Sequence, residues 1–121
     1  HLTKIGSSSF SECDQLRRID FEKNSELQII GNDAFFESEI ESFIVPKTVK
    51  KICEGAFAFC SNFKIIEFDE NSEIESIASN AFIESNRLVL MIPVKLSEHS
   101  FHVFSKIDDK GEVMFTDSDE E

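Results

Sequence analysis

The sequence predicts a repeat solenoid, with short parallel β-strands stacked on a concave face and turns or short 3-10 segments on the convex face. Three observations indicate this class. Phenylalanine recurs at alternating intervals of 25 and 22 residues, many other positions match at an offset of 47, and no stretch suits a conventional crossover helix. Such periods are typical of solenoids, in which each unit buries its apolar face against its neighbours. The chain holds about four and a half of these units.

The recurring phenylalanines define the units. They are Phe10, Phe35, Phe57, Phe82 and Phe104, so the full period is a pair of units 47 residues long. Matches at that offset include Ile5 with Ile52, Cys13 with Cys60, Ile19 with Ile66, and Asn24-Ser25-Glu26 with Asn71-Ser72-Glu73. We expect the phenylalanines to form one spine along the turn-rich side, with Phe35, Phe57 and Phe82 nearly buried and stacked.

Each unit also carries a stretch whose alternation and β-branched or aromatic content predict a short strand. These stretches are Leu16-x-x-Ile19-x-Phe21, Phe43-x-Val45, Phe63-x-x-Ile66-x-Phe68 and Leu90-x-Ile92. The longer units close with a turn at Asn24-Ser25 or Asn71-Ser72, and the shorter ones close with Pro46 or Pro93. Proline can end a strand because it has no N–H to give to the sheet.

Several of these runs match one family consensus. The clearest are LRRIDFEKNSELQIIGNDAFFES, VKKICEGAFAFCSNFKIIEF and the run Ile44-Val45-Pro46-Lys47-Thr48-Val49. Over roughly residues 2–104 the chain resembles the BspA-like leucine-rich repeat family. The fifth unit departs from the pattern, with His99 in place of Ile and Val103-Phe104 in place of Ala-Phe. The resemblance implies a curved solenoid without catalysis, often on microbial or protozoan cell surfaces, with adhesion or protein-binding roles.

Composition narrows the function classes. The chain has 24 acidic residues against 12 basic ones, for a net charge of −12, which argues against a nucleic-acid or anionic-membrane surface. No apolar run is long enough to insert into a membrane. All 13 aromatic residues are Phe, which has no polar atom, so we expect most of them in the core.

Cysteine and histidine offer little chemistry. Cys13 and Cys60 share one repeat position two units apart, roughly 10 Å by strand spacing, which exceeds disulfide reach. We expect three free thiols, with Cys13 and Cys60 protected, while a Cys53–Cys60 bridge remains the alternative. His99 and His102 have no further ligand tied to them by spacing. The sequence therefore predicts no metal site, no cofactor, no catalytic residue and no enzyme.

The chain changes character after residue 104. We expect residues 1–104 to form the solenoid and residues 105–121 to form a capping hairpin followed by an acidic tail. The hairpin would run from Lys106 to Phe115 around Asp109-Lys110-Gly111, and the tail from Asp117 to Glu121. Because His1 is not an initiator residue and the pattern starts in mid-unit, the chain reads as part of a longer protein. Its localisation stays open.

The strand pattern predicts a partner-binding surface. If Ile and Phe of each strand face the core, the alternate residues face the concave solvent side. The expected contact residues are Arg18, Asp20, Ile44, Ile65, Glu67, Val89 and Met91, with the four apolar ones forming a strip rimmed by Glu67 and Asp69. We expect a non-catalytic module that binds another protein there. A cell-surface adhesin fragment and a structural scaffold segment are the alternatives.

Overall fold

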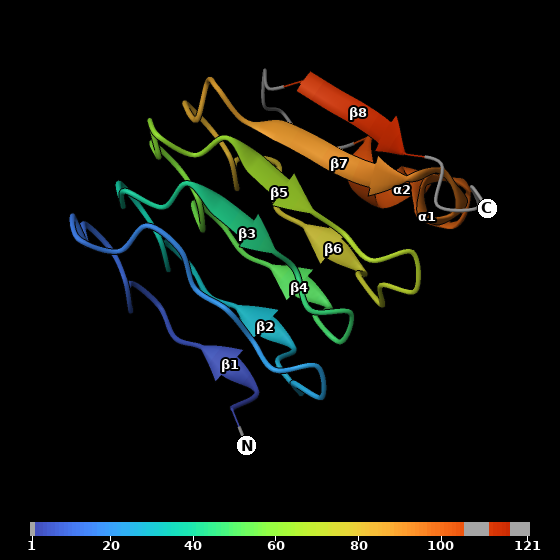
Figure 1. Cartoon of the computed structure of the whole chain (residues 1–121), viewed down its shortest axis with the longest axis horizontal. Coiled ribbons are helices and arrows are strands. Elements are labelled where there is room, and N and C mark those ends of the chain that lie inside the picture. Colours follow the sequence, from blue (N-terminus) through green and yellow to red (C-terminus); the bar gives the residue numbers. More distant parts are fainter. Residues whose placement is uncertain (1, 106–111, 117–121) are drawn as a thin grey trace.

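The computed structural model describes residues 2–105 and 112–116, and it is a solenoid of stacked parallel strands (Figure 1). The second, third and fourth units each pass once through both of the two sheets, while the first unit contributes only β1. The first sheet has the order β1-β2-β4-β6 and the second β3-β5-β7-β8. In chain order, the elements of the solenoid are β1 (Lys4–Ile5), β2 (Ile29–Ile30), β3 (Ser42–Ile44), β4 (Lys51–Ile52), β5 (Ile65–Glu67), β6 (Ser76–Ile77), β7 (Val89–Pro93), α1 (Val94–His99), α2 (Phe101–Phe104) and β8 (Glu112–Thr116). The predicted parallel solenoid is confirmed.

The strand register follows the repeat. In the first sheet Lys4 pairs with Ile29, Ile29 with Lys51, and Lys51 with Ser76, which are steps of 25, 22 and 25 residues. In the second sheet, Phe43 of β3 pairs with Ile66 of β5, and Ile66 pairs with Leu90 of β7. These three positions are those that the sequence pattern aligns.

The phenylalanine spine lies in the turns and fills the space between the two sheets. Phe35, Phe57 and Phe82 are fully buried, as predicted. The ring of Phe57 stacks on Phe35 at 5.0 Å and on Phe82 at 5.6 Å between centroids. Phe10 continues the stack onto Phe35 at 5.3 Å. Aromatic pairs in offset-stacked geometry stabilise one another beyond the area they bury, so the spine ties successive units together.

The first sheet is the part of the fold that the sequence pattern missed. Its strands are only two residues long and hold the isoleucine that precedes each turn: Ile5, Ile30, Ile52 and Ile77, all buried. Two residues show no alternation, so no strand signal exists locally. The pairing arises because stacking brings equivalent backbone segments side by side.

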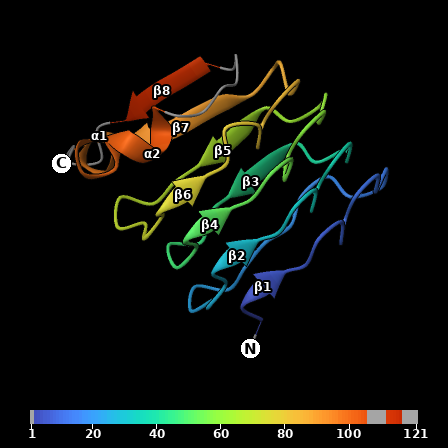
Figure 2. The same ribbon diagram turned by 180° about the vertical axis from the view of Figure 1, so that it is seen from behind.

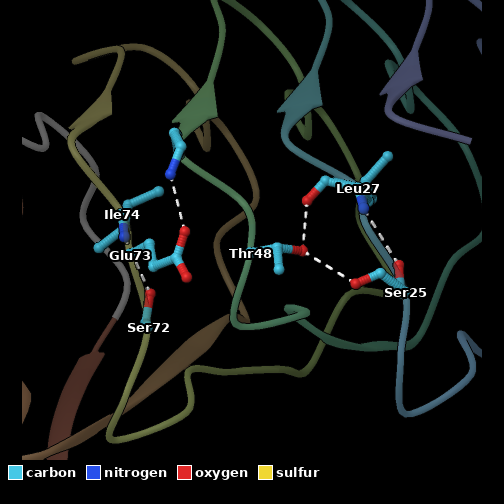
Figure 3. Close-up of polar contacts among 7 residues, drawn as sticks. Ser25, Leu27, Thr48, Ser72, Glu73 and Ile74 are labelled. Carbon is cyan, nitrogen blue, oxygen red and sulfur yellow. Dashed lines mark hydrogen bonds and ion pairs between the residues drawn. The ribbon is translucent and has the colours of Figure 1, made fainter.

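The loops that close the units behave as the Asn-Ser pairs predict. The hydroxyl oxygens of Ser25 and Ser72 each accept a hydrogen bond from the N–H two residues on, at 3.2 Å in both loops (Figure 3). In the intervening loop the Thr48 hydroxyl donates to the Leu27 carbonyl at 2.6 Å. These bonds satisfy backbone groups within the loops and link one loop to the next.

A charged contact accompanies these loop bonds. The Lys50 Nζ lies 2.7 Å from the Glu73 carboxylate, and this hydrogen bond raises the pKa of Lys50. Lys50 and Glu73 belong to neighbouring units, so the pair crosses the unit boundary.

The fifth unit differs from the other four. The two short helices α1 and α2 follow β7, and they place Leu96 and Val103 in the core. Phe104 does not extend the spine, contrary to its place in the sequence pattern, because α2 directs it to Phe68, where the rings meet edge to face at 5.1 Å. These helices and β8 lie together at one end of the solenoid (Figures 1 and 2).

The segment after residue 105 is described only at 112–116. There β8 runs parallel to β7, with Leu90 paired to Val113 and Met91 to Met114. The hairpin expected around Asp109-Lys110-Gly111 and the acidic tail from Asp117 lie outside the described residues. The division at residue 104 therefore stays a prediction.

Candidate functional site

The outer face of the second sheet presents the residues that the strand pattern assigns to solvent. Alternation along β3, β5 and β7 points Phe43, Ile66 and Leu90 inward, and all three are buried. The outward positions form two rows across the sheet. The first row runs Ser42–Ile65–Val89 and the second runs Ile44–Glu67–Met91.

Apolar side chains dominate these rows. Ile44 is 61% exposed and Ile65 is 36% exposed, while Val89 and Met91 are half-buried. Ile65 and Val89 are direct neighbours in the sheet. Glu67 lies between Ile44 and Met91 in its row, so it interrupts the apolar strip instead of standing at its rim as the sequence analysis expected. The register, which pairs Ile44 with Glu67 and not with Ile65, is the reason for the difference.

The predicted contact residues of the first unit lie outside the strands of the sheet, beside the second unit, and Asp20 shares a groove with Ile44 and Glu67 of the second row. Arg18 and Asp20 are exposed and form an ion pair with each other at 3.2 Å. Their segment is not a strand. It joins the second unit through the Glu41 N–H, which donates to the Arg17 carbonyl at 2.8 Å, and through the Arg17–Glu41 ion pair at 3.1 Å. Exposed pairs of this kind contribute little stability.

A groove of about 590 Å³ opens where the strands of the second sheet end and the closing loops begin. Of the predicted contact residues, it brings together Asp20, Ile44 and Glu67. Arg18, Ile65, Val89 and Met91 are not part of its lining. The complete lining is Ile19, Asp20, Phe21, Glu22, Lys23, Ser25, Ile44, Val45, Pro46, Lys47, Glu67, Phe68 and Asp69.

The groove is lined by both apolar and charged side chains. Phe21, Ile44 and Pro46 supply exposed or half-buried apolar surface. The charged lining residues are four acids, Asp20, Glu22, Glu67 and Asp69, and two bases, Lys23 and Lys47. Sequence reasoning did not select Phe21, Pro46 or Lys47, since it followed only the alternate strand positions. Pro46 could have indicated the groove from the sequence, because a proline at the end of a strand marks where the sheet surface gives way to the loop.

The described residues were compared with the requirements of a metal site, a membrane-spanning helix and a reactive thiol. Within residues 2–105 and 112–116, no group of three or more His, Cys, Asp or Glu side chains is arranged to bind a metal ion. In the same part of the chain no helix is long and apolar enough to span a membrane. All three cysteines are free thiols. Burial raises the pKa of the Cys60 thiol, which disfavours the reactive thiolate.

We predict that a thiol reagent modifies Cys13 and Cys53 quickly in the native protein and Cys60 only on unfolding. Cys60 is fully buried, whereas Cys13 and Cys53 are half-buried. Cys13, which the sequence pattern predicts to be protected, is half-buried because its unit contacts a described neighbour on one side only. Mass spectrometry during alkylation measures the three rates. Modification of Cys60 as fast as Cys53 would contradict the core placement, and a mass lowered by two hydrogens would indicate a disulfide.

In the comparison with known proteins, the repeats of this chain match one protein family. A family model described as "BspA type Leucine rich repeat region (6 copies)" matches residues 1–109, which is most of the chain. No curated protein and no solved structure matches the chain. The matched range includes all of the strands from β1 to β7 and both short helices.

Proposed function

Since this chain belongs to the BspA-type leucine-rich repeat family, we propose that it is a non-catalytic module that binds another protein. The contact surface is the outer face of the second sheet, together with the groove at the ends of its strands. One observation carries the proposal: Ile44, Ile65, Val89 and Met91 stay at least partly exposed on adjacent strands of a sheet whose other face is fully packed.

The exposed apolar rows support contact with a protein partner. Single exposed apolar residues are ordinary, but contiguous ones on neighbouring strands mark interaction surfaces more often. Their strands are held in register by the packed core, so the surface is already formed before a partner arrives. A preformed surface lowers the ordering cost of association.

The charges around the groove specify the chemistry of the partner. Asp20, Glu22, Glu67 and Asp69 outnumber Lys23 and Lys47 there, and the whole chain carries a net charge of −12. A basic partner is therefore attracted, while nucleic acid and anionic lipid are repelled. We infer a partner that places an apolar side chain on Ile44 and basic side chains near the four carboxylates.

The proposal predicts that Ile65→Lys combined with Val89→Lys abolishes partner capture. Both positions are on the outer face of adjacent strands, so the double variant should fold, with a loss of unfolding free energy of about 1–2 kcal/mol because the two lysines lie directly opposite each other. Two added charges at the centre of an apolar contact should weaken binding by at least about a hundredfold. Affinity capture with the tagged chain, compared by quantitative mass spectrometry, measures the loss, and circular dichroism verifies folding.

The matched control is Ser76→Lys, which adds a lysine at an exposed position on the outer face of the first sheet. This variant should capture the same proteins as the wild type. If the folded double variant still captures every wild-type partner, the surface assignment is wrong. An adhesin would yield cell-surface or matrix ligands in the same experiment, and a scaffold segment would yield subunits of one assembly.

A further inference from the structure

A second apolar surface lies on the turn side of the solenoid. The first four units each make a six-residue turn after their first-sheet strand, at 7–12, 32–37, 54–59 and 79–84, and these turns stack on one another. Phe36, Phe59 and Ile83 project from the turns of three consecutive units. Phe59 is 46% exposed, Ile83 is 38% exposed, and Phe36 is half-buried. We call these three residues the turn ridge.

The ridge is continuous across the units. The rings of Phe36 and Phe59 meet edge to face with their centroids 5.6 Å apart. The Phe59 N–H donates to the Ile83 carbonyl at 2.8 Å, so the backbone places the third residue directly beside the second. Phe36 and Phe59 are therefore in side-chain contact, and Ile83 lies on the adjacent turn, paired with Phe59 through the backbone.

Phe59 is an unusual residue type for the backbone conformation at its position. It adopts a left-handed backbone conformation with φ of 58°. The equivalent positions in the other units are Glu12, Glu37 and Glu84, which have φ of 58°, 55° and 61°. A bulky aromatic residue is uncommon in this region, and solvent exposure offers it little burial in return. Glutamate fills the position in the other three units that make this turn, so the fold itself does not require a phenylalanine there.

The charge around the ridge is mostly of one sign. The stacked turns and the residues that follow them, 7–15, 32–40, 54–62 and 79–87, contain seven acids and one base, Arg87. The acids are Glu12, Asp14, Asp33, Glu37, Glu39, Glu54 and Glu84. The groove at the opposite ends of the strands, in contrast, includes Lys23 and Lys47. The turn side is therefore the more purely acidic of the two surfaces.

We propose that the turn ridge is a second docking surface, which binds a basic polypeptide segment carrying an aromatic or aliphatic side chain between lysines or arginines. The apolar side chain packs on Phe36, Phe59 and Ile83, and the flanking cations face Glu37 and Glu84. A second copy of the chain is disfavoured as the occupant because its own ridge has the same acidic border. The module could then bind two partners at once. One would contact the outer face of the second sheet and the groove at the ends of its strands, and the other would contact the turn ridge.

The test uses a short synthetic peptide with one phenylalanine between two pairs of lysines, and the same peptide with serine in place of phenylalanine. Binding is followed by amide chemical shifts of the isotope-labelled chain. The phenylalanine peptide should shift the resonances of Phe36, Phe59 and Ile83, and the serine peptide should bind at least about tenfold more weakly. Shifts that are confined to the outer face of the second sheet, or equal binding of the two peptides, would overturn the proposal.

Phe59→Glu separates a specific contact from general attraction. This variant restores the residue that the other units use, so it should fold, and it adds one negative charge. General attraction predicts tighter binding of the lysine peptide, whereas the turn ridge predicts binding weakened by about tenfold. Ile83→Ser, which takes the residue that Ser11 supplies in the first unit, gives a second variant should the first fail to fold. Unchanged or tighter binding to the folded variants contradicts the ridge.

The double variant Ile65→Lys with Val89→Lys is the matched control, because it leaves the turn ridge intact. Its ridge shifts should persist at an affinity within about threefold of the wild type, allowing for its two added positive charges. Loss of the ridge shifts in this variant would place the peptide on the sheet and overturn the ridge. The control also keeps the two surfaces separable, since each set of variants alters only one of them.

Discussion

Phe57→Ala should lower the free energy of unfolding by about 3–5 kcal/mol, the typical cost of truncating a buried aromatic side chain. Phe57 is the central ring of the spine. It stacks on Phe35 and Phe82, and it contacts Phe43 at 5.2 Å and Phe63 at 5.1 Å. A cavity at this point would loosen contacts in three units at once. Since small domains are stable by only about 5–15 kcal/mol, the loss should be plain in chemical denaturation.

The control is Phe59→Ala, a change of the same residue type two positions along the chain. Phe59 is 46% exposed and contacts the Phe36 ring at one edge, so its truncation should cost about 1–2 kcal/mol, clearly less than that of Phe57. Equal midpoints for Phe57→Ala and the wild type would mean that the turns do not stack in the register described. Equal losses for Phe57→Ala and Phe59→Ala would contradict the assignment of one ring to the core and the other to solvent.

Ser85→Ala should lower the free energy of unfolding by about 2–3 kcal/mol, because it leaves two buried backbone groups without a partner. The Ser85 side chain is fully buried. Its hydroxyl donates to the Phe57 carbonyl at 2.6 Å and accepts from the Cys60 N–H at 3.0 Å. One hydroxyl therefore satisfies both a donor and an acceptor of the preceding unit. The loss should appear in urea unfolding as a lower midpoint with an unchanged slope.

Ser85→Cys is the matched comparison. Cys60 occupies the equivalent position in the preceding unit, where its thiol lies 3.0 Å from the Phe35 carbonyl and donates to it. A thiol can thus take part in the same interaction, although as a weaker donor and acceptor. The cysteine variant should retain about half or more of the stability that alanine loses. If alanine and cysteine proved equally neutral, the buried hydroxyl would have no role in joining the units.

The repeat itself could be read from the sequence because solenoid packing places one residue type at one site many times. Phe35, Phe57 and Phe82 occupy equivalent environments, so their spacing predicts their stacking. The same logic predicted Phe43, Ile66 and Leu90 as inward-facing residues of neighbouring strands. Cys13 and Cys60 were predicted to share one repeat position, which Ser38 and Ser85 also occupy; Ser38, Cys60 and Ser85 are buried and Cys13 is half-buried.

Other features escaped the sequence analysis because they depend on the assembled fold. The strands of the first sheet are too short for a periodic signal, and the helices α1 and α2 replace a repeat whose pattern has already degenerated. The position of Glu67 between Ile44 and Met91 depends on register, which fixes lateral neighbours that alternation alone does not specify. The groove forms where three separate segments meet, so Phe21, Pro46 and Lys47 come together only in three dimensions.

Site-specific photo-cross-linking tests the central claim, that the outer face of the second sheet contacts a protein partner. A photoreactive amino acid replaces Glu67 in one variant, and Ser76 on the outer face of the first sheet in another. Both positions are exposed, so neither replacement should perturb folding. Irradiation with captured partners should give a covalent adduct from position 67 and none from position 76. Adducts from position 76 alone, or equal yields from both positions, would contradict the account.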